Sequence, residues 1–390
     1  MIYLDNNATT RLDPQVAEAI RRVWDLGPLN PSSQHRAGRQ ARNLLDEAIS
    51  ELGRCLGADV DSPGGDSLVL TSGGTEANNL AVLGIGDASG PLVISALEHP
   101  SVLEPARAAA RAGREVRLIP LTSNGRIDLA AARELIVERS PRPALVSVMS
   151  ANNETGVIQP LAELAGICRK AAVPLHVDAT QTVGKMPLDF AALGLAALSA
   201  AAHKFHGPAG IGLLLVRSGV PLRSALLGGE QQLGKRAGTE PVGLAVGMAT
   251  ALTIALQQLD ASATLMGQCR ERLETGLLGD FPELVIHGVS APRLAGTTCI
   301  SFPGADRQAM LMALDIAGVA CSSGSACASG SSRPSHVLAA MGVAGELIDT
   351  ALRFGFSRFS TTDDADRAVE LISRQYRRLR EKLVVENSRV

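Results

Sequence analysis

Between residues 67 and 216 the chain alternates short apolar runs with amphipathic helical segments, and this alternation constrains the fold more than any other feature. Strand-length runs that alternate with helices are typical of an α/β domain with a mostly parallel sheet. Ligands of such sheets bind beyond the carboxyl ends of the strands, so functional residues should lie in the loops that follow the runs. The apolar runs are 68–71, 92–95, 144–148, 175–177 and 210–216, and the clearest helical segments are 129–138 and 161–169.

The C-terminal third does not continue this repetition. Strands and helices are mixed there without βα units, which indicates a smaller α+β domain. We therefore predict a large α/β domain over residues 12–259 and a small domain formed by residues 1–11 and 260–390, which carries a Gly/Ser-rich loop at 321–332. The expected elements of the small domain are a helix at 265–278, strands near 285–287 and 297–302, and a last helix at about 362–385.

The longest uncharged run, residues 241–259, contains Thr250, Thr253 and Gln257 as well as several glycines. These side chains fit a buried core helix better than a membrane span. The N-terminal segment has neither the basic nor the apolar region of a signal peptide. We therefore expect a cytoplasmic protein without a membrane-spanning segment.

Composition narrows the chemistry. The 390-residue chain carries 37 basic and 39 acidic residues, a net charge of −2, and 3% aromatic residues, which argues against nucleic acid as a partner. The six cysteines are dispersed without a CxxC pair, so we expect no zinc site and mostly reduced, buried thiols. Only five basic residues are lysines, and arginine cannot replace lysine in Schiff-base chemistry because it stays protonated.

Residues 71–79 combine a strand end, a glycine turn and a helix start. Free backbone amides at a helix N-terminus, beside Gly74 and the hydroxyl group of Thr75, are suited to bind a phosphate. The spacing is neither that of a P-loop nor that of a dinucleotide fingerprint. A plain strand-to-helix turn capped by threonine explains the segment equally well.

Asp178 and Lys204 follow two further apolar runs. The carboxylate of Asp178 comes directly after a buried-looking strand and needs a partner there, although a helix N-cap would also explain it. Lys204 lies between His203 and His206, and a lysine desolvated by small apolar residues is what Schiff-base chemistry requires. A surface lysine and a metal-binding HxxH motif remain as alternatives.

Cys327 and Arg353 lie in the C-terminal part. A Gly/Ser-rich loop cannot pack a core, so Cys327 is expected to be exposed and mobile, unless the loop is a linker with an incidental cysteine. Arg353 lies in an apolar strand, where a buried arginine usually grips a carboxylate or phosphate, and a structural ion pair is the alternative. The turn at residues 71–79, Asp178, Lys204 and Arg353 together describe a pyridoxal-phosphate (PLP) site.

These segments, in this order and spacing, resemble the cysteine desulfurases of the class V aminotransferase superfamily, in particular the long-loop group of iron–sulfur cluster assembly and nitrogen fixation. The resemblance covers essentially the whole chain. It implies an α/β chain with the PLP-dependent transferase fold of type I. The matching motifs are 3–10, 30–33, 71–79, 98–100, 152–156, 177–181, 203–208, 236–240, 322–329 and 353–360.

The resemblance also implies roles for individual residues. The catalytic residues would be Lys204, which holds the cofactor covalently, His99, which stacks on its ring and assists proton transfers, and Cys327, which accepts sulfur. The PLP ring would be bound by Asn153, by Asp178 at the pyridine nitrogen and by Gln181 at the phenolate oxygen. The phosphate would be bound by Gly74, Thr75, His203 and, from the partner subunit of a homodimer, Thr239. Asn153 and Arg353 would bind the substrate, with Arg353 on its carboxylate.

The implied reaction converts L-cysteine to L-alanine and leaves a persulfide on Cys327, which then donates sulfur to an iron–sulfur scaffold or a tRNA-thiolation partner. Cys327 is also a candidate metal ligand, through transient contact with an iron–sulfur cluster. Selenocysteine lyase or another class V PLP enzyme is the enzymatic alternative. A PLP-binding sulfur carrier that does not turn over is the non-enzyme alternative.

Two positions with possible chemical consequences depart from the usual pattern. Ala201 stands where a serine or threonine commonly contacts the phosphate, so one charge-assisted hydrogen bond, about 1.5 to 3 kcal/mol, is absent or replaced. Cys321 adds a second thiol six positions before Cys327. We expect Cys321 to be a buried cysteine rather than a resolving thiol.

Overall fold

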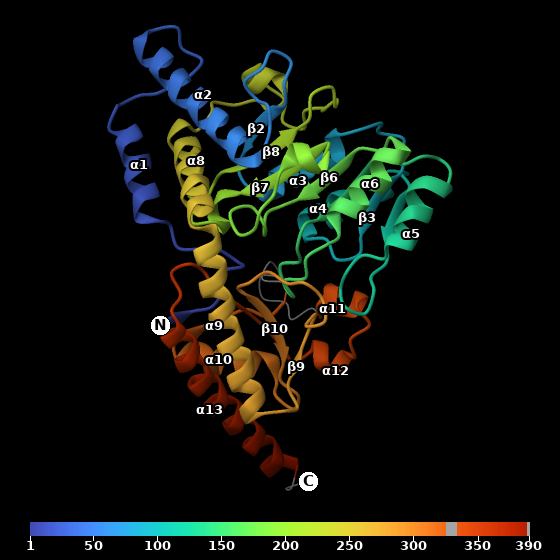
Figure 1. Cartoon of the computed structure of the whole chain (residues 1–390), viewed down its shortest axis with the longest axis vertical. Coiled ribbons are helices and arrows are strands. Elements are labelled where there is room, and N and C mark those ends of the chain that lie inside the picture. The colour runs from blue at the N-terminus through green and yellow to red at the C-terminus, as the bar shows by residue number, and fades with distance from the viewer. Residues whose placement is uncertain (325–333, 388–390) are drawn as a thin grey trace.

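The protein is built around a seven-stranded sheet, seen in the upper half of Figure 1. The structure, a computed structural model, describes residues 1–324 and 334–387. The strand order is β2-β8-β7-β6-β5-β3-β4, and β8 alone runs antiparallel to its neighbours. This arrangement confirms the predicted mostly parallel sheet. The strands are β2 (Ser67–Thr71), β3 (Leu92–Ser95), β4 (Val116–Ile119), β5 (Leu145–Met149), β6 (Leu175–Asp178), β7 (Ala197–Ala201) and β8 (Gly212–Val216).

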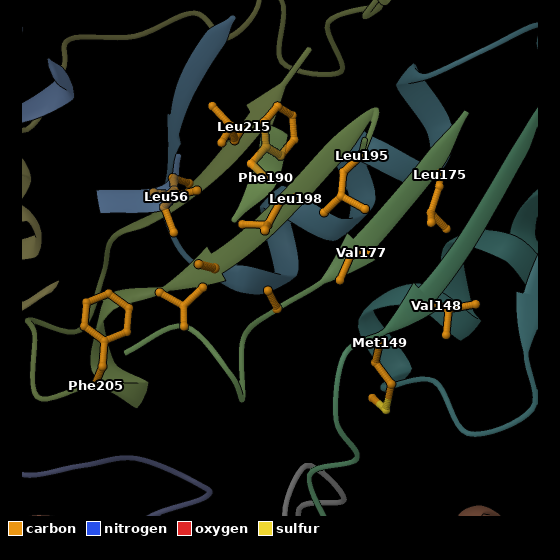
Figure 2. Packing of buried hydrophobic residues seen from close by; sticks show 14 of the residues in the cluster. Leu56, Val148, Met149, Leu175, Val177, Phe190, Leu195, Leu198, Phe205 and Leu215 are labelled. Carbon is orange, nitrogen blue, oxygen red and sulfur yellow. The ribbon is translucent and has the colours of Figure 1, made fainter. Parts of the chain in front are cut away.

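Helices cover both faces of this sheet, so its inner strands are buried on both sides. In β8, Leu213 and Leu215 pack into one core while Leu214 and Val216 pack into the other. Figure 2 shows Leu215 in the first core with Leu198 of the neighbouring strand and side chains from the helical segments. Burial on both faces is why these strands read as continuous apolar runs. The helices are α1 (Pro14–Trp24), α2 (Arg36–Leu56), α3 (Gly74–Gly84), α4 (Pro100–Arg111), α5 (Leu129–Arg133) with a π-turn (Glu134–Glu138), α6 (Leu161–Ala171), α7 (Phe190–Leu193) and α8 (Val242–Gln257).

A second sheet lies in the lower half of Figure 1 and has its own core. It consists of β9 (Val285–Ile286), β10 (Thr297–Ser301) and β12 (Ala351–Gly355), all antiparallel, and β1 (Ile2–Tyr3) pairs separately with β11 (Val319–Ala320). The domain boundaries given above stay a prediction. The remaining helices are α9 (Leu259–Asp280), α10 (Arg307–Ile316), α11 (His336–Ala340), α12 (Gly345–Ile348) and α13 (Thr362–Asn387).

The uncharged segment forms α8, which is mostly buried, as predicted. Within residues 1–324 and 334–387, no single helix is long and apolar enough to cross a membrane, and only α8 and α9 pass such a test as a pair bent by 73°.

Candidate active site

The sequence-predicted site residues converge at the carboxyl ends of the parallel strands. A cavity of about 310 Å³ lies there, where ligands of such sheets bind. Two predicted residues are not among those that line it: Thr239 is exposed on the surface, and Cys327 lies outside the described residues. The predicted residues that line the cavity are Gly74, Thr75, His99, Asn153, Asp178, Gln181, His203, Lys204 and Arg353.

Asp178 ends β6 with its carboxylate at the cavity, where it is 5% exposed. Its Oδ2 accepts a hydrogen bond from Nδ2 of Asn78 at 2.7 Å, and its Oδ1 accepts one from the backbone N–H of Thr180 at 2.9 Å. These two donors fix the orientation of the carboxylate at the cavity. The chain after Asp178 forms turns rather than a helix, so the N-cap alternative does not describe this residue.

Asn78 joins Asp178 to a buried polar network that the sequence analysis did not identify. Its Nδ2 also donates to Oγ of Ser101 at 2.8 Å, and its Oδ1 accepts from Oγ of Ser199. Ser199 in turn lies 3.2 Å from Nε2 of His176, a fully buried histidine whose pKa is lowered to about 4 by burial. A sequence signal existed: Asn78 lies four residues after Gly74, on the same face of α3.

His99 is both a cavity residue and the N-cap of α4. Its Nδ1 accepts the backbone N–H of Ser101 at 3.1 Å and lies 2.7 Å from the Ser101 hydroxyl oxygen. An acceptor nitrogen carries no proton, so the proton of the neutral ring is on Nε2. Burial also lowers the pKa of His99, outweighing the opposing effect of Asp178. His99 is therefore a neutral ring with an Nε2–H donor.

Lys204 ends a short 3₁₀ turn (Ala202–Lys204) after β7. Its Nζ donates to the backbone carbonyl oxygens of Asn7 at 2.6 Å and Ala8 at 2.7 Å, so the N-terminal segment fixes the amine at the cavity. Lys204 is half-buried and lines the cavity, so it is not the surface lysine of the first alternative.

The two histidines that flank Lys204 have separate environments. Nδ1 of His203 lies 3.1 Å from Oγ1 of Thr9, whereas Nδ1 of His206 lies 2.8 Å from the carbonyl oxygen of Arg11. Burial lowers the pKa of both rings to about 4. No group of three metal-ligating side chains occurs in the part of the chain that the structure describes, so nothing there supports the metal-binding HxxH alternative.

The N-terminus of α3 forms one end of the cavity. Oγ1 of Thr180 is buried there and has no hydrogen-bond partner among the described residues. A Cβ atom at Gly74 would lie 3.1 Å from this hydroxyl oxygen and 3.5 Å from Cβ of Ala201, so both side chains face the same point. An unpaired hydroxyl beside free helix amides fits a phosphate group.

Arg353, in β12, is 2% exposed and contacts both Asp5 and the cavity. Its Nη2 pairs with Oδ1 of Asp5 at 2.8 Å, and its Nη1 donates to the carbonyl oxygens of Asn153 at 3.1 Å and Gly324 at 3.4 Å. Its Nε is buried and has no partner in the described chain. The guanidinium therefore forms a structural ion pair and keeps a donor that a bound carboxylate can use.

Fold and site together define an enzyme class, and comparison with known proteins identifies it. The family model described as aminotransferase class-V matches residues 2–368. The chain is similar to a cysteine desulfurase of Sinorhizobium fredii, with 40% identity over 384 residues that cover 97% of each protein. The chain belongs to the class V aminotransferase family, in its cysteine desulfurase branch.

Solved structures agree with this assignment. A NifS-like protein from Rickettsia africae has a TM-score of 0.88 and 33% identity, covering 97% of this chain and 99% of that protein. A structure described as SspA in complex with cysteine has a TM-score of 0.77 and 27% identity, covering 93% of this chain and 100% of that protein. These likenesses confirm the expected PLP-dependent fold.

Proposed function

We propose that this enzyme converts L-cysteine to L-alanine and carries the released sulfur as a persulfide on Cys327. The observation that carries the proposal is the convergence of Lys204, Asp178 and Arg353 on one cavity. A lysine amine, a buried carboxylate and a guanidinium with an unpaired donor are the groups that amino-acid chemistry on PLP requires. The solved relative described as a complex with cysteine supports the choice of substrate.

The cavity residues fit PLP, the cofactor of this family. The unpaired hydroxyl of Thr180 and the amides of α3 suit its phosphate, and the carboxylate of Asp178 suits a protonated pyridine nitrogen. Gly74, Thr75 and His203 would complete the phosphate site, and Asn153 and Gln181 would bind the ring. When bound, PLP supplies an electron sink for the charge that develops at the substrate Cα.

The chain's own residues orient the substrate and move its protons. The guanidinium of Arg353 binds the substrate carboxylate, assisted by Asn153. The amine of Lys204 removes the Cα proton, and the carbonyl oxygens of Asn7 and Ala8 then accept hydrogen bonds from the ammonium that results. His99 stacks on the cofactor ring and assists proton transfers as an Nε2–H donor, because its Nδ1 is committed to Ser101.

The nucleophile of the proposed sulfur transfer is a cysteine thiolate. The thiolate of Cys327 attacks the substrate sulfur, so a sulfur–sulfur bond forms and the carbon–sulfur bond of the substrate breaks. The electron pair of the broken bond stays with Cβ, which takes a proton and becomes the methyl group of alanine. The sulfur of Cys327 and the sulfur of the substrate are each oxidised by one electron, and Cβ is reduced by two, so no external oxidant is needed.

The proposed function is tested with the purified protein, PLP and L-cysteine. We expect visible absorption from the bound cofactor, and alanine and protein-bound sulfur in equal initial amounts. Alanine formation only from selenocysteine would favour the lyase alternative instead. A protein that takes up sulfur but forms no alanine would favour the carrier alternative.

A homodimer would complete the site. Thr239 is exposed, and the same surface segment exposes Leu227 and Leu233 at 85% and 87%. Exposed leucines in one segment are typical of an interaction surface. We infer that this segment packs on a second copy and brings Thr239 to the phosphate of the partner's site.

The sulfur acceptor that we propose is an iron–sulfur scaffold or a tRNA-thiolation protein in the cytoplasm. The chain segments that flank the Cys327 loop both contact the cavity wall: the carbonyl oxygen of Gly324 accepts from Arg353, and Ser335 donates to Glu154 at 2.5 Å. These contacts hold Gly324 and Ser335, one on each side of Cys327 in the sequence, at the cavity, which supports Cys327 as the sulfur carrier.

Replacing Arg353 with lysine should raise KM for L-cysteine about 10- to 100-fold, because an ammonium cannot keep the contacts of Nη1 and Nη2 and also offer the donor that Nε supplies. Steady-state kinetics measure the effect. Asp5→Asn is the matched control, since it removes the ion pair and keeps the guanidinium. An equal rise of KM in Asp5→Asn would mean that the ion pair alone sets substrate affinity.

Replacing Thr180 with valine should weaken PLP binding about tenfold, because it removes one hydrogen bond to a charged group. Equilibrium dialysis of the cofactor measures the dissociation constant. Adding Ala201→Ser to the valine variant should restore the affinity, since both side chains face the same point. Unchanged binding in Thr180→Val would show that the hydroxyl does not contact the phosphate.

A further inference from the structure

Lys185 has no part in the roles above, yet it lies directly behind the active site. It is half-buried and lines a second, smaller cavity together with Lys204 and Arg358. Its Nζ donates to Oε1 of Gln181 at 3.1 Å. Gln181 itself lines the main cavity. Lys185 therefore reaches the cofactor site through one side chain.

The other end of the Gln181 amide is also fixed. Its Nε2 donates to the carbonyl oxygen of Asn7 at 3.0 Å, and Nζ of Lys204 donates to the same oxygen at 2.6 Å. The protonated amine of Lys185 can only donate and a carbonyl oxygen can only accept, so both contacts demand the same orientation of the amide. In the reverse orientation the NH₂ group of Gln181 would face the Lys185 donor, and its oxygen would face the carbonyl oxygen of Asn7.

No carboxylate among the described residues compensates the Lys185 charge. Burial, together with the positive charges of Lys204 and Arg353, lowers the pKa of Lys185 to about 7. The neighbouring rings of His203 and His206 are neutral, since burial lowers their pKa to about 4. A lysine held among cations costs stability, which points to a role in function.

We propose that Lys185 is a positioning residue that holds the Gln181 amide with its oxygen turned away from the cofactor and its NH₂ group on the cavity side. The NH₂ group is then the donor that meets an oxygen of the bound ring, and a cationic donor on Oε1 makes it a stronger one. The inference rests on the proposed PLP site and adds a residue to it that makes no contact with PLP.

The experiment compares Lys185→Met and Gln181→Met with the variant that carries both. Each single change should weaken PLP binding about tenfold, the loss expected for one hydrogen bond to a charged group. The double variant should bind PLP no more weakly than Gln181→Met alone, because Lys185 acts only through Gln181. Lys185→Arg, which keeps a cationic donor, should recover most of the affinity, and Lys170→Met, a change of an exposed lysine, should have no effect.

A second measurement does not depend on the cofactor. In protein without PLP and with ¹⁵N-labelled glutamine, the side-chain amide signal of Gln181 is identified by its absence in Gln181→Met. It should shift in Lys185→Met and stay in place in Lys170→Met. Thermal unfolding checks that the variants are folded.

The outcomes separate the two claims. A wild-type protein that binds no PLP would refute the proposed function, while the glutamine signal would still decide whether Lys185 orients Gln181. An unshifted signal, or additive losses of PLP affinity in the double variant, would overturn the positioning role. Equal weakening by Lys185→Arg and Lys185→Met would overturn the requirement for a cationic donor.

Discussion

Replacing Lys204 with alanine should lower the rate of alanine formation from L-cysteine by at least about 10⁴-fold. The amine is expected both to hold the cofactor covalently and to move the Cα proton, and general base catalysis alone contributes 10²- to 10⁴-fold. No neighbouring group can replace it. The amine of Lys185 is held on Gln181, and His99 has no free basic nitrogen because its Nδ1 already accepts from Ser101.

The measurement combines a spectrum with a rate. The alanine variant should still bind PLP, because Thr180, Asp178 and the N-terminus of α3 are unchanged, but its absorption should be that of free PLP. Lys170→Ala is the control for loss of a lysine, since Lys170 is exposed on α6. Retention of a tenth or more of the wild-type rate in Lys204→Ala would contradict the role given to this amine.

The sequence predicted the parts of the site whose residue type is unusual for its surroundings. Asp178 and Lys204 each place a charge directly after an apolar run, and Arg353 places one inside an apolar strand; a charge in such a place needs an explanation. The turn at Gly74 could also be predicted, because it joins an apolar strand to a helix, and both are recognisable in the sequence. These positions are also those that match the family motifs.

Residues whose role depends on a partner far away in the sequence were not identified in this way. Asn78 contacts Asp178, which lies one hundred positions away in the sequence. The proposed role of Lys185 depends on the hydrogen bond between Gln181 and the carbonyl oxygen of Asn7. Such pairings exist only once the sheet has formed.

Some helices and strands were not predicted from the sequence, for reasons that lie in their local sequence. β7 consists of alanine, leucine and serine, which have no strand signature, and its identity comes from pairing with β6 and β8. β4 contains Arg117, whose side chain turns back to pair with Glu115. The helices α1 and α2 precede the strand–helix alternation from which we predicted the fold.

The second large effect is expected for Cys327→Ser, which should abolish protein-bound sulfur when the enzyme is incubated with L-cysteine. The described cysteines are poor replacements, because thiolate is the nucleophile and burial disfavours it. Burial raises the pKa of Cys168 and Cys321 to about 12, and it also raises the pKa of Cys299. Cys55 has a raised pKa for the same reason, and it contacts Thr253 on α8, away from the cavity.

The assay follows ³⁵S from labelled L-cysteine onto the protein, with and without a thiol reductant that releases persulfide sulfur. Cys321→Ser is the matched control: it removes a thiol six positions away, and because Cys321 is half-buried with a strongly raised pKa, the label should be retained. Label on Cys327→Ser at the wild-type level would place the sulfur elsewhere and contradict the persulfide mechanism. Loss of label in both variants would instead mean that the two thiols work as a pair, with Cys321 as the resolving thiol that its burial argues against.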